Sequence, residues 1–462
     1  MKTLIKNAIA VVSSVSKRTN LVESDGGFIC TNNSIIIDDN IIKEIGVDLE
    51  CEADQVIDAK GKIVYPGLVN THHHLIQCFA RNIPASQNME LFEWLGIIFN
   101  VMLKVNPEFM YHSMMVAGGE LLRYGCTTLF DHQYAYPYGQ CMELIDEQFR
   151  GSDELGIRYF CGRGSVTRSQ EKGGLAPDPL VEKLDHVLKA TEEVIRKYND
   201  KTPFAMHGAA VAPCSPFNVD EATMIESAKL ARSLGSKIHT HLCETKDEEK
   251  YCLEHYGMRP LAWMEKTGCI GPDTWYAHGI HFNDEELKLL ADTKTGISHC
   301  PVSNMKLSSG ICRVPEMLKL GVPLSLAVDG SGSNDGSNML EELRVSYLVH
   351  RLRSSYDAPT GAQLLNIATL GGAKILGLDS FTGSLEAGKA ADLFMLDVSQ
   401  LDNVGAYDDP VAFLVTVGYK RPAALTMVNG KIVVKDGHLV NVDEEKLSRN
   451  ATAFYKKIEY RL

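Results

Sequence analysis

The stretch Pro66-Gly67-Leu68-Val69-Asn70-Thr71-His72-His73-His74 joins a short apolar run to three consecutive histidines. The apolar run is typical of a β-strand, in which alternate side chains point to the same face. His72 and His74 therefore share a face, and two imidazoles at the end of a strand supply half of a metal site. A cluster of surface histidines is the alternative interpretation of the same residues.

Three later segments repeat this design, a short β-rich run that ends in a polar side chain. They are residues 238–244, 275–278 and 324–329, and the polar side chains are those of His241, Glu244, His278 and Asp329. An isolated aspartate after a strand more often caps a turn or a helix. In a parallel barrel, however, the carboxyl ends of all strands meet at one mouth. The sequence therefore predicts that these residues converge at a single site.

The pattern of the whole chain predicts a (β/α)8 barrel, because short apolar runs alternate with longer amphipathic segments from about residue 66 to 379. Within it we expect helices over 107–124, 221–234 and 284–293. Both ends of the chain are instead rich in strands. These are expected at residues 4–12, 34–38, 41–45, 62–64, 393–396, 424–428 and 431–434.

The Asn429-Gly430 pair between the last two of these strands is a strong hairpin signal. Residues 1–65 and 380–440 are therefore expected to form a small β-sandwich from both termini. We expect a C-terminal helix over 441–462.

Composition excludes several classes of partner. The 462 residues carry a formal net charge of −13, which argues against nucleic acid. No run of about 20 apolar residues predicts a membrane span, and residues 1–16 lack a convincing signal-peptide cleavage site. The twelve cysteines form no C-x-x-C pair, which favours packed, reduced thiols and a cytoplasmic location. The net negative charge is instead consistent with a small diffusible substrate.

At this point the chain resembles the amidohydrolase superfamily, and within it the mononuclear aminohydrolase branch. The resemblance covers nearly the whole sequence and is closest to 8-oxoguanine deaminases and to triazine and pterin aminohydrolases. The motifs that carry it are residues 66–74, His-Leu-Cys-Glu at 241–244, Ala-His at 277–278, Ser-His-Cys-Pro-Val-Ser-Asn at 298–304, Val-Asp-Gly-Ser at 328–331 and Val-Asn-Gly-Lys at 428–431.

The resemblance implies one divalent metal, with zinc as the first choice and iron as the alternative. The implied ligands are His72, His74, His241 and Asp329. Glu244 is then the proton shuttle, His278 polarises the attacking nucleophile, and Asp329 takes a proton from water. We expect His73 and His239 to face away from the metal. No lysine convincingly ends a strand between His74 and His241, which favours one metal over two.

The implied reaction is the hydrolytic deamination of a purine-like ring, with 8-oxoguanine giving urate and ammonia. Gln77, Arg163 and Cys214 are the candidate substrate-binding residues, and Trp94 either stacks on the ring or packs in the core. The alternatives are hydrolysis of an N-alkyl or chloro triazine or of a pterin at the same site, and, more remotely, a barrel that serves only as a scaffold. The resemblance also implies a homo-oligomer, as a dimer or larger assembly.

Overall fold

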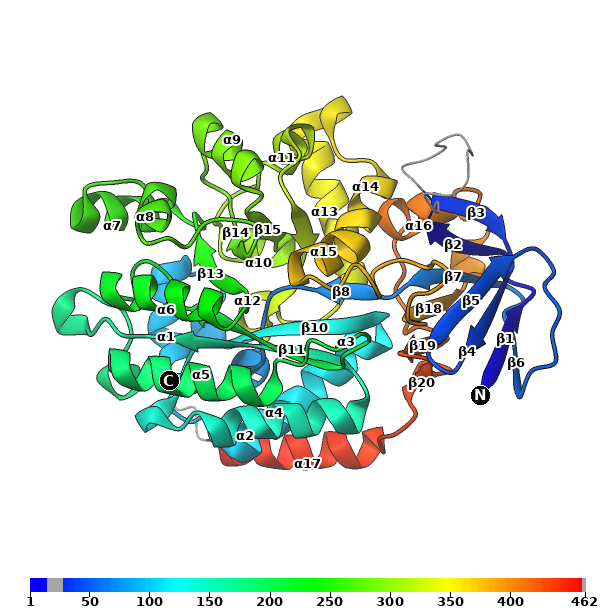
Figure 1. Cartoon of the computed structure of the whole chain (residues 1–462), viewed down its shortest axis with the longest axis horizontal. Helices are drawn as coiled ribbons and strands as arrows, with labels where there is room; N and C mark the ends of the chain where they lie inside the picture. Colours follow the sequence, from blue (N-terminus) through cyan, green and yellow to red (C-terminus); the bar gives the residue numbers. More distant parts are fainter. Residues whose placement is uncertain (15–27, 459–462) are drawn as a thin grey trace.

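The chain folds around a barrel of eight parallel strands that are neighbours in the order of the chain (Figure 1). The computed structural model describes residues 1–14 and 28–458. The barrel strands are β8 (Leu68–Asn70), β10 (Cys126–Gln133), β11 (Arg158–Ser165), β12 (His207–Pro213), β13 (Ile238–Leu242), β14 (Thr274–His278), β15 (Gly296–His299) and β16 (Leu324–Leu326). Every neighbouring pair is parallel.

A short extra pair of strands closes the barrel between its first and last strands. β9 (His73–His74) continues β8, and β17 (Asp329–Gly330) continues β16, and the two pair in parallel with Asp329 opposite His73. Below this pair, the Asn70 side chain accepts a hydrogen bond from the backbone of Val328, with an N···O distance of 3.0 Å. The seam of the barrel therefore runs through two of the histidine- and aspartate-bearing strand ends.

Helices surround the barrel, as Figure 1 shows. In chain order they are α1 (Leu91–Met102), α2 (Pro107–Ser113), α3 (Gly119–Arg123), α4 (Met142–Leu155), α5 (Leu184–Tyr198), α6 (Glu221–Ser233), α7 (Lys246–Tyr256), α8 (Pro260–Lys266), α9 (Asp284–Thr293), α10 (Pro301–Lys306), α11 (Val314–Leu320), α12 (Ser331–Asn334), α13 (Met339–Ser354), α14 (Gly361–Asn366) and α15 (Gly372–Leu376). The predicted helices over 221–234 and 284–293 are confirmed as α6 and α9. The helix predicted over 107–124 is α2 and α3 joined by a π-helical turn, η3 (Met114–Gly118).

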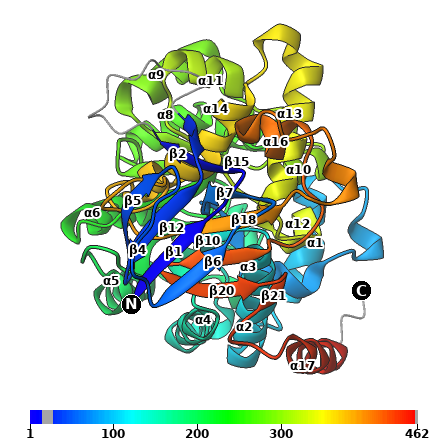
Figure 2. The same cartoon turned by 90° about the vertical axis from the view of Figure 1, so that its right-hand side faces the viewer.

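Strands from both ends of the chain form two further sheets, which face the viewer in Figure 2. One sheet has the order β5-β4-β1-β6, with β1 (Lys2–Lys6), β4 (Ser34–Asp38), β5 (Ile41–Gly46) and β6 (Gln55–Asp58). The other has the order β21-β20-β19-β18-β7-β2-β3, with β2 (Ala10–Ser14), β3 (Phe28–Asn32), β7 (Lys62–Pro66), β18 (Leu393–Asp397), β19 (Leu425–Val428), β20 (Lys431–Lys435) and β21 (His438–Leu439).

The two sheets share a core of aliphatic residues from both termini, including Ile5, Ile37, Val64, Leu393 and Met427. This arrangement confirms the predicted fold class, a barrel with a small β-sandwich built from both ends. The exact domain boundaries stay a prediction, and residues 15–27 and 459–462 of the predicted domains lie outside the described residues.

Two local features decide the bounds of the terminal strands. The single strand expected over 4–12 is two strands, because the chain turns at Asn7, whose φ is +65°. The predicted hairpin is present, with Asn429 and Gly430 at φ +48° and +77° between β19 and β20. Positive φ at both central residues is the geometry of a type I′ turn.

The last part of the chain returns to the barrel. A short helix, α16 (Pro410–Thr416), precedes β19, and α17 (Glu444–Lys457) lies along the barrel helices. Phe454 of α17 is buried against Phe79 and Phe109. Within the described ranges, no helix is both long and apolar enough to cross a membrane.

A buried ion pair joins the barrel to the terminal sheets. Arg158, at the start of β11, donates to the carboxylate of Asp392, just before β18, with an N···O distance of 3.0 Å. The same carboxylate accepts hydrogen bonds from the Thr382 hydroxyl and the Asn429 backbone. Both charged side chains are almost completely buried.

Replacing only the cation is therefore expected to be costly. Arg158→Met leaves the Asp392 carboxylate buried without its counter-charge, which destabilises the protein by about 3–5 kcal/mol. The double variant Arg158→Met/Asp392→Asn removes both charges, and we expect it to unfold at a higher temperature than the single variant. Thermal unfolding followed by circular dichroism measures both. A single variant as stable as the double variant would contradict this assignment.

Candidate metal centre

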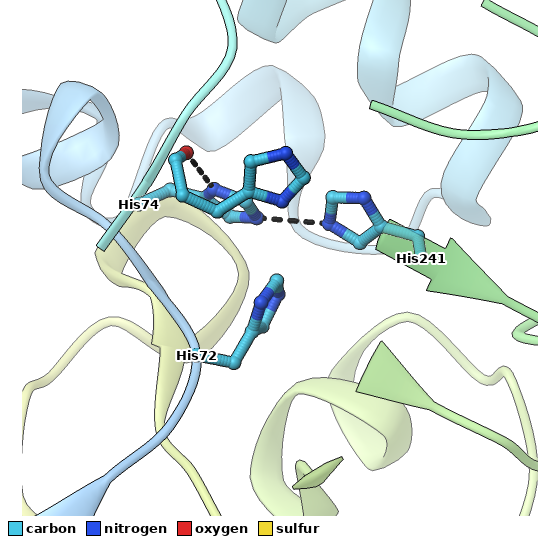
Figure 3. Close-up of side chains that lie close together, drawn as sticks. His72, His74 and His241 are labelled. Atoms are coloured by element: carbon cyan, nitrogen blue, oxygen red, sulfur yellow. Dashed lines mark hydrogen bonds between the residues drawn. The ribbon is translucent and has the colours of Figure 1, made fainter. Parts of the chain in front are cut away.

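Four side chains from three different parts of the chain converge at the mouth of the barrel. These side chains, called here the ligand set, are His72, His74, His241 and Asp329. Asp329 Oδ1 lies 3.2 Å from His72 Nε2 and 3.3 Å from His74 Nε2. His74 Nε2 lies 3.0 Å from His241 Nε2. Figure 3 shows the three imidazole rings turned toward one another.

Backbone carbonyls fix which nitrogen of two of these histidines is free. His74 Nδ1 donates to the carbonyl of His132 at 2.8 Å, and His241 Nδ1 donates to the carbonyl of Cys214 at 2.7 Å. A neutral imidazole carries one hydrogen, so both Nε2 atoms bear lone pairs. Two lone pairs that face each other across 3.0 Å repel, unless a cation lies between them.

The ligand set fits such a cation. Ligand atoms held about 2.1 Å from a tetrahedral zinc ion lie about 3.4 Å apart, close to the separations observed here. His72 Nε2 is buried and has no hydrogen-bond partner among the described residues, as expected for an atom reserved for a metal. Three imidazoles and one carboxylate are donors that suit zinc and also iron.

Two hydroxyl groups orient the aspartate. Ser303 and Ser333 both donate to Asp329 Oδ2, at 2.5 and 2.8 Å. The other oxygen, Oδ1, also accepts from the Gly330 backbone at 2.7 Å. These contacts turn Oδ1 toward the histidines and hold it there.

Glu244 and His278 lie beside the ligand set and face each other. His278 Nε2 is 3.4 Å from Glu244 Oε2, and Ser309 donates to Glu244 Oε1 at 3.2 Å. Burial, and next the nearby charge of Asp329, raise the pKa of Glu244 well above its usual value. Burial lowers the pKa of His278 to about 3. Burial therefore favours the protonated carboxyl of Glu244 beside a neutral imidazole of His278.

The backbone at this mouth is strained at three strand ends. Cys243, His278 and Asp329 have φ values of +54°, +74° and +63°, a region that costs a non-glycine residue roughly 1–3 kcal/mol. Glu248 offsets part of that cost after β13, because its buried carboxylate accepts hydrogen bonds from the backbones of Cys243 and Glu244, each at 3.0 Å. The sharp turns aim the side chains into the mouth of the barrel.

The cavity next to the ligand set is lined by predicted and unpredicted residues. Gln77 of η1 (Leu75–Ala80) and Cys214 line it, as does Trp94 of α1, which is also 98% buried. The hydroxyl of Ser215 and the indole nitrogen of Trp94 are buried and without partners among the described residues. The cavity measures about 30 Å³, room for a few waters at most, so a ring enters only when lining side chains move.

Arg163, the third predicted substrate-binding residue, is not brought to this cavity. It is fully buried at the end of β11, where it donates to Glu182 at 2.5 Å and to the carbonyl of Gly164 at 2.7 Å. The guanidinium carbon of Arg163 also lies over the ring of Tyr136, 4.5 Å from the ring centroid. These contacts give Arg163 a structural role, which a position at a strand end alone did not reveal.

The prediction that His239 faces away from the ligand set is wrong. Alternate residues of a strand share a face, so His239 and His241 of β13 both point into the barrel, and His239 Nε2 lies 2.8 Å from His72 Nδ1. Burial, and next the surrounding histidines, hold the pKa of His239 well below its usual value. His73 does point elsewhere and contacts the Ser337 hydroxyl at 3.0 Å.

Sequence reasoning also missed His132. Its ring belongs to a group in which one nitrogen each of His72, His74, His132 and His241 lies within 4.8 Å of the others. His132 Nε2 donates to the carbonyl of Ala212 at 2.6 Å, and Nδ1 has no partner within the described part of the chain. The sequence did carry a signal, since Asp131 and His132 directly follow the β-rich run at 126–130.

A larger cavity of about 690 Å³ lies elsewhere, between α17 and the segments η1, η3 and α3. Its lining includes Arg81, Glu120, Arg123 and Glu444, and no member of the ligand set. Volume alone is therefore a poor guide to the chemistry of this protein.

Comparison with known proteins agrees with this geometry. The model of the amidohydrolase family matches residues 63–433. Hydroxydechloroatrazine ethylaminohydrolase of Pseudomonas sp. (strain ADP) is 38% identical over 90% of this chain and 87% of its own. The 8-oxoguanine deaminase of Pseudomonas aeruginosa is 38% identical over 96% of both chains.

A solved structure is similar over the full length. The zinc complex of atrazine chlorohydrolase from Arthrobacter aurescens TC1 superposes with a TM-score of 0.92 at 29% identity, over 98% of this chain and 100% of that one. The match to the family model spans the barrel and, of the terminal strands, β7, β18, β19 and part of β20. The chain therefore belongs to the amidohydrolase family.

Proposed function

We propose that this protein is a metal-dependent hydrolytic deaminase that converts 8-oxoguanine to urate and ammonia. The observation that carries the proposal is the ligand set beside the buried carboxyl of Glu244, which faces His278. The likeness to an 8-oxoguanine deaminase over 96% of the chain supports the choice of ring. Zinc is the proposed cofactor, since the similar atrazine chlorohydrolase was crystallised with zinc, and iron is the alternative.

The ligand set would hold the cation, which activates water as a nucleophile at neutral pH. In our proposal, the carboxylate of Asp329 accepts a proton from the attacking water. Glu244 gives its proton to the ring nitrogen next to the amine-bearing carbon. His278 Nε2 holds the incoming oxygen, because Asn304 donates to His278 Nδ1 at 2.9 Å and leaves the hydrogen on Nε2. The proton of the added hydroxyl then returns to Glu244, and the proton taken by Asp329 passes to the amine. The water oxygen stays on the ring as a carbonyl, and the amine leaves as ammonia.

The polar groups of the cavity favour a ring that carries carbonyls. The indole N–H of Trp94 and the hydroxyl of Ser215 are donors without partners among the described residues. 8-Oxoguanine has two ring carbonyls that can accept from them, and an unpaired buried donor costs about 1–3 kcal/mol. Gln77 presents an amide to the same space.

A triazine substrate is the second candidate. The ethylaminohydrolase that resembles this chain is as similar to it, at 38% identity, as the 8-oxoguanine deaminase. The two reactions use the same nucleophile and differ in the leaving group. Product analysis therefore separates them better than any feature of the ligand set.

A comparison of kcat/KM for 8-oxoguanine, a pterin and N-alkyl triazines tests the choice of substrate, with ammonia followed for the first two and the released alkylamine for the triazines. We expect 8-oxoguanine to exceed the others by roughly tenfold or more, because a ring with fewer carbonyls leaves donors unpaired. Mass spectrometry identifies each product, and Glu244→Gln protein serves as the control for contaminating activity. If a triazine or a pterin gives a larger kcat/KM than 8-oxoguanine, the proposed substrate is wrong. No turnover of any of the three classes of compound would contradict the proposal that the protein is a deaminase.

The second prediction separates metal binding from proton transfer. Glu244→Gln is expected to keep its metal and to lose roughly 10²–10⁴-fold in kcat, because only the proton donor is removed. His241→Asn is expected to lose the metal itself. Metal content is measured by mass spectrometry after purification without added metal. Equal metal loss in the two variants would show that Glu244 does not act as a proton donor alone.

A further inference from the structure

His239 occupies the layer of the barrel directly beneath the ligand set. It is fully buried on β13, two residues before His241. Its ring stacks on Trp275 with a centroid distance of 4.5 Å and an interplanar angle of 25°, and it meets the edge of Phe130 at 5.1 Å. The proposed reaction assigns it no role. The rings on both sides hold its orientation.

Both nitrogens of His239 are engaged. Nδ1 lies 3.0 Å from the backbone carbonyl of Trp275, and Nε2 lies 2.8 Å from His72 Nδ1. A carbonyl only accepts, so Nδ1 of His239 carries the hydrogen and donates it. A neutral imidazole has a single N–H, so Nε2 of His239 must accept.

Because His239 Nε2 accepts a hydrogen bond, it determines the tautomer of His72. His72 must carry its hydrogen on Nδ1 and donate it to His239. His72 Nε2 is then left with a lone pair, and this is the atom 3.2 Å from Asp329 Oδ1. A chain of two hydrogen bonds therefore runs from the Trp275 carbonyl through His239 to the ligand atom of His72.

His72 differs in this respect from the other two histidines of the ligand set. The Nδ1 atoms of His74 and His241 donate directly to backbone carbonyls. Only for His72, within the ligand set, does another side chain stand between the imidazole and a carbonyl. The tautomer of His72 therefore depends on a residue that can be replaced by mutation.

We infer that His239 is a positioning residue that selects the metal-binding tautomer of His72 and thereby raises the affinity of the centre for a divalent cation. The inference rests on the metal site of the proposed function but not on the identity of the substrate. Partners of this kind orient metal ligands, and their loss typically costs 10–100-fold in metal affinity.

Two substitutions at the same position test the inference. In His239→Gln, an amide oxygen replaces the Nε2 acceptor, so His72 still has a partner for its Nδ1 hydrogen. In His239→Leu, the apolar side chain fills space but cannot accept. We expect the zinc dissociation constant, measured by competition with a chelator, to rise about 10–100-fold for the leucine variant and to stay within about threefold of the parent for the glutamine variant. Circular dichroism of both metal-free variants checks that the fold is kept.

A leucine variant that folds and binds zinc as tightly as the parent would overturn the inference. So would a glutamine variant as weak as the leucine variant, since that result would mean that packing alone matters. If the leucine variant does not fold, the tautomers of His72 and His239 are measured directly in the metal-free parent protein. Two-dimensional ¹H–¹⁵N spectra of its histidine rings are expected to show Nδ1 protonated in both His72 and His239, and hydrogen on Nε2 of His72 would contradict the inference.

These outcomes are distinguishable from failure of the proposed function. The parent protein could bind zinc, and the two His239 variants could show the expected affinities, while no heterocycle is deaminated. That result would support the role of His239 and contradict the proposed substrate. A parent that binds no divalent cation refutes the metal site and the affinity role of His239 together. The chelator competition with the parent protein alone separates these two results.

Discussion

The closure of the barrel is the constraint on which this site depends. The seam between the first and last barrel strands is closed by the pairing of β9 with β17, and that pair carries His74 and Asp329. Asp329 also donates its backbone N–H to the carbonyl of His72 at 3.2 Å. Residues more than 250 positions apart in the chain are thereby held in register by the same hydrogen bonds that complete the sheet. The backbone hydrogen bonds of this seam therefore both stabilise the barrel and fix the positions of the metal ligands.

The rest of the mouth is arranged to hold unfavourable conformations in place. Three strand ends adopt positive φ, and four imidazoles, those of His72, His74, His239 and His241, are packed against one another with little solvent. The buried carboxylate of Glu248 and the hydroxyls of Ser303 and Ser333 fix the backbone and the aspartate in these positions. Strain of this kind persists only where surrounding contacts over-determine the geometry. A cation shared by the ligand set would relieve the repulsion between the lone pairs that face each other.

Much of this arrangement could be predicted from the sequence, because strand ends in a parallel barrel share one mouth. The β-rich run at 275–278 lies within β14 (Thr274–His278), and the strand-end histidines do converge. Side-chain partners could not be predicted in the same way. Arg163 pairs with Glu182 from a loop of no distinctive pattern, so its burial is a tertiary effect. The inward position of His239, in contrast, follows from the two-residue period of a strand and was within reach of the sequence.

The central claim is that one divalent cation binds where the first and last barrel strands meet. A crystal structure of the zinc-loaded protein, with anomalous data collected at the zinc edge, tests it most directly. We expect one strong peak about 2.0–2.2 Å from Nε2 of the three histidines of the ligand set and from Asp329 Oδ1. A peak bound by other residues, or an empty mouth in crystals that hold zinc elsewhere, would contradict it.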